Sequence, residues 1–132
     1  MDILQPPGWP RPRGYANGIA ARGRLVFVSG MIGWNADGQF DSDDFVDQAR
    51  QALRNIVDVL REAGARPEHI VRMTWYVVDR REYLSAGSAL GAAYRDVIGA
   101  HYPAMTAVEV RALIEERARV EIEATAVVPD GD

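Results

Sequence analysis

The chain has 132 residues, a formal net charge of −4 at pH 7, no cysteine and no lysine. One domain with a buried core fits this length, and the missing residue types exclude disulfides, thiolate metal sites, cysteine nucleophiles and Schiff-base catalysis by an internal lysine. The acidic balance argues against nucleic acid, and the chain has neither a membrane-length apolar run of roughly 18–20 residues nor a signal-peptide core, so we expect a soluble cytoplasmic protein that contacts neither nucleic acid nor membrane.

The N-terminal part of the chain predicts an arm followed by a hairpin. Residues 1–13 are rich in proline and lack periodicity, so we expect an extended or disordered arm. A strand-like pattern begins near Tyr15, and Arg22–Gly23 offers a turn before LVFVSG at Leu25–Gly30. Together these features predict a hairpin, followed by a loop over residues 31–40.

The clearest helix lies in DSDDFVDQARQALRNIVDVLREAGA, residues 41–65. Asp41 or Ser42 can cap its first N–H groups, and Gly64 ends it. Apolar residues recur at helical spacing and predict one buried stripe. The stripe comprises Phe45, Ala49, Ala52, Leu53, Ile56, Val57 and Leu60.

Three strands and a second helix complete the expected order. Ile70 to Asp79 reads as a strand, Tyr83 to Val97 as a helix, and Met105 to Leu113 and Arg119 to Val128 as two further strands. The order ββαβαββ predicts an α+β fold in which two helices cover one face of a mixed sheet. The chain then divides into an arm, a single domain and a short tail, at residues 1–13, 14–128 and 129–132.

Alternation along the strands assigns their side chains to two faces of the sheet. The side facing the helices is expected to hold Val26, Val28, Met73, Trp75, Val77, Val108, Val110, Val120 and Ile122. The other face is expected to hold Leu25, Phe27, Thr74, Tyr76, Val78, Met105, Ala107, Glu109, Arg111, Leu113, Glu121 and Glu123. That second face is too apolar for open water and too charged for a closed core, which predicts a homo-oligomer.

Motifs for metal, cofactor or nucleophile chemistry are missing. His69 and His101 are the only histidines, neither stands at metal-ligand spacing from another ligand, and no HExxH occurs, so we expect ordinary surface or capping histidines. GYANG and GMIG match no phosphate loop, and there is no GxSxG elbow. We therefore expect no metal and no cofactor.

Carboxylates and aromatic residues remain as candidates for function. Glu121 lies in RVEIEAT on the mixed face, where it serves either as an acid or base or as an interface ion pair to Arg111 or Arg119. Tyr15 is either an edge aromatic or a ligand contact. Trp34, in a glycine-flanked loop, is either a stacking surface for a planar ligand or a loop anchor.

The succession of short motifs resembles a known family. GY, LVFVSG, L-x-x-AGA, I-V-x-x-T-x-Y-V-x-D, YPAMTAVEV and VEIEATAV, with Gln48 and Asn55 between them, are similar to the RidA/YjgF family of imine and enamine deaminases, also described as endoribonuclease L-PSP. The resemblance covers about Gly14 to Val128. It implies a chorismate-mutase-like α+β domain, a homotrimer with ligand sites in the clefts between subunits, a small-molecule substrate and no cofactor.

The resemblance implies roles for several positions of this chain. The family's N-terminal tyrosine falls on Tyr15, and the backbone that helps to hold the substrate falls on Ser29 and Gly30. The glutamate that positions the attacking water falls on Glu121.

The chain departs from the family pattern where an arginine clamps the substrate carboxylate. That place reads Met105, followed by Thr106, and methionine cannot hold a carboxylate. The family's glutamine after the serine-glycine is Met31, and its asparagine in the second helix falls near Gly87 or Ser88. With Trp34 nearby, the resemblance implies a soft, apolar cleft formed by Met31, Trp34 and Met105.

Three functions follow as hypotheses. The first is a hydrolytic deaminase of reactive imines or enamines, with an aromatic-derived or aminomuconate-type substrate. The second is a non-catalytic trimer that binds a small metabolite or another protein, which the missing arginine favours. The third is a ribonuclease, which the acidic balance and the lack of lysine and of a histidine pair oppose.

Overall fold

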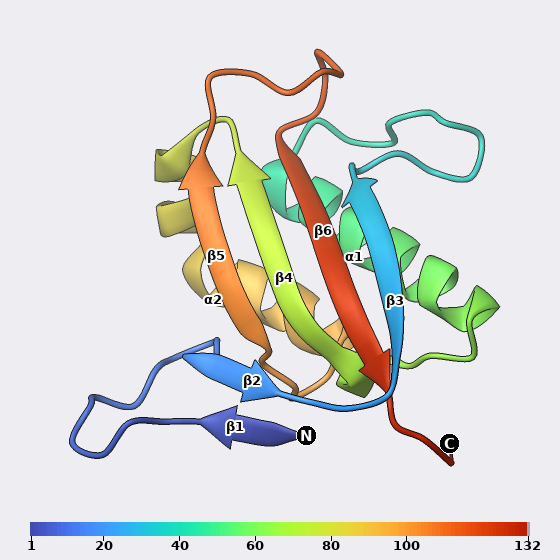
Figure 1. Ribbon diagram of the computed structural model, residues 1–132. Helices are drawn as coiled ribbons and strands as arrows, with labels where there is room; N and C mark the ends of the chain where they lie inside the picture. Colours follow the sequence, from blue (N-terminus) through green and yellow to red (C-terminus); the bar gives the residue numbers. More distant parts are fainter. Residues whose placement is uncertain (132) are drawn as a thin grey trace.

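The computed structural model describes residues 1–131 and has two layers (Figure 1). One layer is a four-stranded sheet in the order β3-β6-β4-β5, and the other consists of α1 and α2, which cover one face of that sheet. The elements are β3 (Arg24–Met31), α1 (Phe45–Glu62), the short 3₁₀ helix η1 (Pro67–His69), β4 (Ile70–Val77), α2 (Arg80–Val97), β5 (Ala104–Glu109) and β6 (Val120–Val128). All strand pairs in this sheet are antiparallel except β4 with β5. The expected α+β class and mixed sheet are confirmed.

The N-terminal segment forms a small hairpin of its own. Strand β1 (Asp2–Leu4) pairs antiparallel with β2 (Gly18–Ala20), and β3 pairs with β6. The predicted hairpin between the segment after Tyr15 and Leu25–Gly30 is therefore wrong. The reason is that β6 offers β3 a long antiparallel partner with matching alternation, which outweighs the local turn at Arg22–Gly23.

Helix α1 forms the principal contact between the layers. Its N-cap is Asp44, whose side chain accepts a hydrogen bond from the Asp47 N–H at 3.0 Å, rather than Asp41 or Ser42 as predicted. Ser42 instead hydrogen-bonds the Asp44 N–H and the Asp47 carboxylate, so it supports the cap from outside. The predicted stripe is buried except for half-buried Val57. It packs against β3 and β6 and closes the core.

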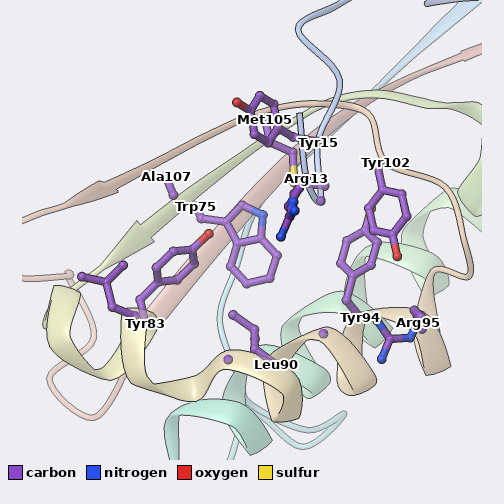
Figure 2. A pocket seen from close by; sticks show the side chains of 14 residues that line it. Arg13, Tyr15, Trp75, Tyr83, Leu90, Tyr94, Arg95, Tyr102, Met105 and Ala107 are labelled. Carbon is purple, nitrogen blue, oxygen red and sulfur yellow. The ribbon is translucent and has the colours of Figure 1, made fainter. Parts of the chain in front are cut away.

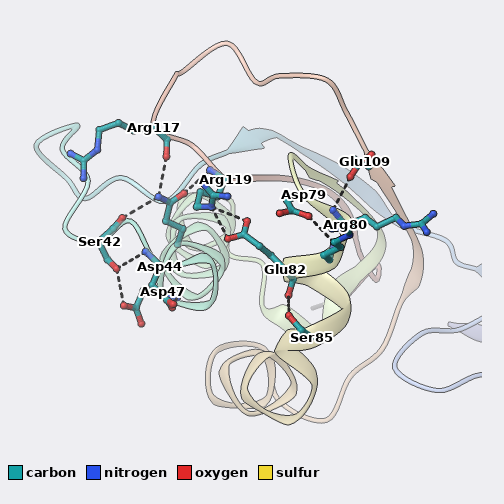
Figure 3. Close-up of polar contacts among 12 residues, drawn as sticks. Ser42, Asp44, Asp47, Asp79, Arg80, Glu82, Ser85, Glu109, Arg117 and Arg119 are labelled. Carbon is teal, nitrogen blue, oxygen red and sulfur yellow. Dashed lines mark hydrogen bonds and ion pairs between the residues drawn. The ribbon is translucent and has the colours of Figure 1, made fainter.

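Helix α2 packs on α1 and is broken at Gly87. There φ is 47° and ψ is −120°, a left-handed conformation that glycine adopts without a Cβ penalty. Figure 3 shows how its start is fixed. The Arg119 Nε donates to both Glu82 carboxylate oxygens at 2.8 Å, and the Glu109 carboxylate accepts from the Arg80 N–H at 2.9 Å. The helix start is thus tied to the beginning of β6 and the end of β5.

The two faces of β3, β4 and β6 match the alternation. Met73, Trp75, Val77, Val120 and Ile122 are buried on the helix side, together with Val28. On the open face, Leu25 and Phe27 are 58% and 74% exposed. The open face therefore carries large apolar side chains that nothing within residues 1–131 covers.

The predicted faces of β5 are reversed. Met105 pairs with Met73 and Ala107 with Trp75 in the parallel register, so both lie on the helix side, whereas Val108 is 42% exposed on the open face. Val108 and Val110 were assigned to the helix side because they are apolar and alternate. In the edge strand β5, however, the side chains on the open face need not be polar. The strand also ends at Glu109, before Arg111 and Leu113.

Candidate functional site

A cavity of about 690 Å³ lies between α2 and the β4–β5 edge of the sheet (Figure 2). Its wall on α2 includes Gly87 and Gly91, which contribute no side-chain volume between helix and sheet. The helix break at Gly87 lies in the same wall. The cavity is lined by Arg13, Gly14, Tyr15, Trp75, Tyr83, Leu84, Gly87, Leu90, Gly91, Tyr94, Arg95, Tyr102, Met105 and Ala107.

The segment at residues 13–15 reaches the cavity because its neighbours are fixed beside β5. The Ala16 N–H donates to the Pro103 carbonyl at 3.0 Å, and Ala16 forms a parallel bridge with Ala104. The Asn17 side-chain amide donates to the Gln5 side chain at 2.8 Å, which joins both sides of the loop between β1 and β2. The arm thus forms a hairpin with β2, and residues 13–15 of its loop line the cavity.

Five of the residues that line the cavity are aromatic, and four of them form two ring pairs. Tyr94 and Tyr102 are stacked with ring centroids 5.4 Å apart, and Tyr83 meets Trp75 edge to face at 6.3 Å. The Tyr94 hydroxyl donates to the His101 carbonyl at 2.6 Å, and burial raises the pKa of Tyr94. Tyr94 therefore remains neutral, and the rings offer flat, polarisable surfaces to a ligand.

The charges at the cavity are all positive. Arg13 and Arg95 are the ionic side chains among its lining residues, and neither forms an ion pair with any carboxylate in residues 1–131. The Trp75 indole nitrogen is buried and has no hydrogen-bond partner. The cavity thus offers donors and lacks an anionic acceptor.

Of the predicted site residues, Tyr15 and Met105 line this cavity. Ser29 and Gly30 lie in β3 at the open face, together with Glu121 of β6. The four-stranded sheet therefore separates Glu121 from the cavity within one protomer. The structure brings the predicted residues together as two groups, not as one site.

Glu121 lies directly against Gly30. A Cβ added at Gly30 would come within 2.8 Å of the Glu121 carboxyl carbon, so the missing side chain makes room for the carboxylate. Glu121 is half-buried and forms no ion pair within residues 1–131. Arg119, one suggested partner, is engaged by Glu82, and Arg111 lies beyond the end of β5.

The neighbouring carboxylate on the open face has a partner. The Tyr76 hydroxyl donates to Glu123 at 2.6 Å, and this hydrogen bond raises the pKa of Tyr76. Glu121 and Glu123 therefore differ in their surroundings although they share one strand face. This pair offers a matched comparison for any role of Glu121.

The other predicted residues lie elsewhere. Met31 is half-buried against the core, and Trp34 packs beside Phe40 with ring centroids 6.4 Å apart, outside the cavity. Thr106 is on the open face, where its hydroxyl accepts from the Arg72 guanidinium at 3.4 Å. Met31 and Trp34 therefore do not share the cavity with Met105 within one protomer, because Met105 lies on the opposite side of the sheet from the one assigned. The apolar cleft expected between subunits stays a prediction.

Both histidines have structural contacts. The His69 ring Nδ1 accepts from the Arg66 N–H at 3.0 Å, and the His101 Nε2 lies 2.7 Å from the Ile70 carbonyl. Residues 1–131 contain no group of three or more histidine, aspartate or glutamate side chains arranged to hold a metal ion. Nor does that part of the chain contain a helix of sufficient length and hydropathy to cross a bilayer.

Arg13 and Trp75 were not anticipated as parts of a site. Trp75 was correctly assigned to the helix side, but a strand pattern does not reveal that its indole nitrogen lacks a partner. Arg13 lies in PRPRG, where the available signal was a proline-rich arm. Its position depends on the contact of Ala16 with Pro103, which is remote in sequence.

Comparison with known proteins identifies the class. A family model described as Endoribonuclease L-PSP matches residues 10–128. A protein named 2-iminobutanoate/2-iminopropanoate deaminase from Capra hircus is 35% identical over 105 residues, which cover 79% of this chain and 73% of that protein. A RutC family protein from Aquifex aeolicus is 33% identical over 128 residues, or 96% of this chain and 99% of that protein.

A solved structure agrees with these matches. The crystal structure of YyfB from Yersinia pestis, described as a protein of unknown function in the conserved Rid family, has a TM-score of 0.84 and 30% identity and covers 96% of this chain and 98% of its own. The chain therefore belongs to the endoribonuclease L-PSP family, which confirms the RidA/YjgF resemblance.

Proposed function

We propose that the protein is a hydrolytic deaminase of reactive imines or enamines. Family membership and the similarity to a named 2-iminobutanoate/2-iminopropanoate deaminase support this class. The observation that carries the proposal is the half-buried Glu121 carboxylate, which lies against Gly30 and has no ion pair within residues 1–131. A carboxylate without a cation is available as a general base.

The proposed reaction is the addition of water to a carbon–nitrogen double bond. Glu121 accepts a proton from water as the oxygen bonds to the imine carbon, and the proton passes to the nitrogen. Glu121 then takes the hydroxyl proton of the resulting carbinolamine and passes it to the nitrogen, so the C–N bond breaks, ammonia leaves and a carbonyl product remains. Backbone N–H groups near Ser29–Gly30 or Met105–Thr106 would stabilise developing negative charge. An enamine enters the same sequence after protonation at carbon to give the imine.

We propose that this reaction takes place in clefts between the subunits of a homotrimer. The sheet separates Glu121 from the cavity of its own protomer, so Glu121 of one subunit would meet the Tyr15–Met105 cavity of the next. Beyond the bridge of Ala104 with Ala16, β5 is an edge strand of the sheet, which leaves room for another copy on that side (Figure 1). The aromatic cavity wall favours an aromatic-derived or aminomuconate-type substrate over a small aliphatic imine.

Ammonia release is the direct test of the activity. Amino-acid imines and enamines would be generated in the assay, and the initial rate of ammonia formation would be compared with and without the protein. We expect acceleration, with unsaturated or aromatic-derived substrates favoured over 2-iminopropanoate. Spontaneous hydrolysis at the same rate across the panel would reject the deaminase.

The oligomer has its own test. The exposed Leu25 and Phe27 side chains on the open face predict that the chain of 14.6 kDa self-associates, and the family resemblance implies that it elutes as a trimer in size-exclusion chromatography with light scattering. Phe27→Asp should shift the mass toward one protomer because it places a charge in the apolar contact. Ile114→Asp, at a fully exposed loop position, is the control and should remain trimeric. A wild-type mass of one protomer would contradict this assembly.

The alternative is a trimer that binds a small metabolite or a protein without turnover. The specific observation that favours it is Met105, which replaces the arginine expected from the family pattern by a neutral thioether. Thermal-shift screening with carboxylates and aromatic metabolites distinguishes the two functions. Stabilisation by a ligand without ammonia release from any imine related to it would favour the binding protein.

A further inference from the structure

We propose that Arg13 and the indole N–H of Trp75 together bind the carboxylate of a planar, unsaturated ligand in the cavity between α2 and β5. This inference rests on the proposed function, since it names the anchor and the class of substrate. The anchor comes from the loop between β1 and β2 and from β4, not from position 105.

The first argument is the position of Arg13. The contact of Ala16 with Pro103 fixes the chain three residues beyond it, and Figure 2 shows the Arg13 side chain directed into the cavity near the wall formed by Trp75. Its guanidinium is exposed and is paired with no carboxylate in residues 1–131. An arginine that no protein anion neutralises can form a bidentate contact with a ligand carboxylate.

The second argument is independent and concerns Trp75. The side chain is only 4% exposed, and its indole nitrogen is buried with no acceptor. An indole N–H can only donate, and buried donors in folded proteins are normally satisfied. Trp75 lines the cavity beside Arg13 (Figure 2), so a ligand oxygen held by Arg13 would supply the missing acceptor once the neighbouring side chains move to admit it.

The third argument is the chemistry of the remaining wall. The cavity lining contains two arginines and no aspartate or glutamate, so a negative group is favoured over a positive one. Tyr83 and Tyr102 offer ring faces or edges, and their hydroxyls form no hydrogen bond with residues 1–131. A flat conjugated body can lie among these rings while its carboxylate meets Arg13 and Trp75.

This arrangement also accounts for Met105. Its thioether lies on the helix side, half-buried against the core, where a flexible apolar side chain fills an irregular space. A guanidinium at this position would be the third in a cavity that already has Arg13 and Arg95. In this proposal the loop residue Arg13, rather than a residue of β5, supplies the positive charge that binds the carboxylate.

Calorimetric binding of phenylglyoxylate, a planar aromatic 2-oxo acid, tests the anchor without requiring turnover. We expect the wild-type protein to bind the acid at least about tenfold more tightly than its neutral amide. Arg13→Met should weaken binding of the acid about 10- to 100-fold and leave binding of the amide unchanged. Arg13→Lys should restore part of the affinity, since lysine keeps the charge without the bidentate geometry.

Arg11→Met is the matched control, because it removes the same charge from the same proline-rich loop at a residue outside the cavity. It should change the dissociation constant by less than about twofold. Equal effects of the two substitutions, or no binding of phenylglyoxylate to the wild-type protein, would overturn the proposal.

Trp75→Phe keeps a ring and removes the N–H. The folded variant should bind phenylglyoxylate about five- to tenfold more weakly. An unchanged dissociation constant would show that Trp75 is not part of the anchor.

The inference and the proposed function can fail separately. Selective binding of the acid through Arg13 without ammonia release from any imine would reject the deaminase and support the anchor. Ammonia release with the same KM in wild type and Arg13→Met would support the deaminase and reject the anchor.

Discussion

Glu121→Gln is expected to lower kcat for imine hydrolysis by about 10²- to 10⁴-fold, the usual loss when a general base is removed. Glutamine keeps the shape of the side chain beside Gly30 but cannot accept a proton from water. KM should change little, because the proposed carboxylate anchor is a different group. The measurement is ammonia release under saturating substrate, with the thermal midpoint recorded to verify folding.

Glu123→Gln provides the control for this prediction. It removes a carboxylate two residues away on the same strand face, where the partner is the Tyr76 hydroxyl. We expect kcat to remain within a few-fold of wild type. Equal activity of Glu121→Gln and wild type would exclude Glu121 from the mechanism, and equal losses in both variants would indicate a general effect of charge on that face.

Gly30→Ala gives a second readout of the same carboxylate. The new methyl group would occupy the space beside the Glu121 carboxyl group and push the side chain aside without changing its chemistry. We expect a loss of kcat that approaches that of Glu121→Gln. Ser29→Ala, one residue earlier in β3 and exposed, should lose far less activity if only the backbone at this position is used.

Gln48→Ala is expected to lower the free energy of unfolding by about 2–4 kcal/mol. Gln48 is 1% exposed, and its amide donates to the Ser42 and Arg117 carbonyls while its oxygen accepts from the Arg119 N–H at 2.8 Å. Removing it leaves a main-chain N–H and two carbonyls without that partner and opens a space in the protein. Urea unfolding followed by circular dichroism measures the change.

Gln51→Ala is the matched control in the same helix. Gln51 is half-buried and donates one hydrogen bond, to Asn55 at 2.9 Å, so its loss should be below about 1 kcal/mol. Both substitutions replace glutamine by alanine in α1, so their effects on helix propensity cancel. Similar destabilisation by the two variants would show that the Gln48 contacts contribute little.

The elements with strong periodicity were predictable from the sequence. The stripe from Phe45 to Leu60 predicted α1 and its buried face, and the alternation of β6 placed Ile122 inside and Glu121 on the open face. In both cases one side of the element is almost wholly apolar, so the period alone fixes its orientation. The family resemblance then implied the same fold class.

The errors arose where orientation depends on a partner strand. The sequence of β5 has apolar residues on both faces, and only its parallel register with β4 shows that Met105 lies with Met73. Either β1 or β3 could likewise be the partner of β2, and local sequence patterns do not distinguish between them. Arg13 could not be assigned for a similar reason, since its place depends on a contact between residues 16 and 103.

The loop between β1 and β2 lies outside the four-stranded sheet, yet it supplies a wall of the cavity. Met105 packs against the core, so exchanging it alters packing, whereas the side chain of Arg13 is exposed. Ligand preference in this protein can therefore diverge through mutation of exposed loop side chains such as Arg13 with little loss of stability. Exchange of this loop between relatives offers a route to new selectivity on an unchanged scaffold.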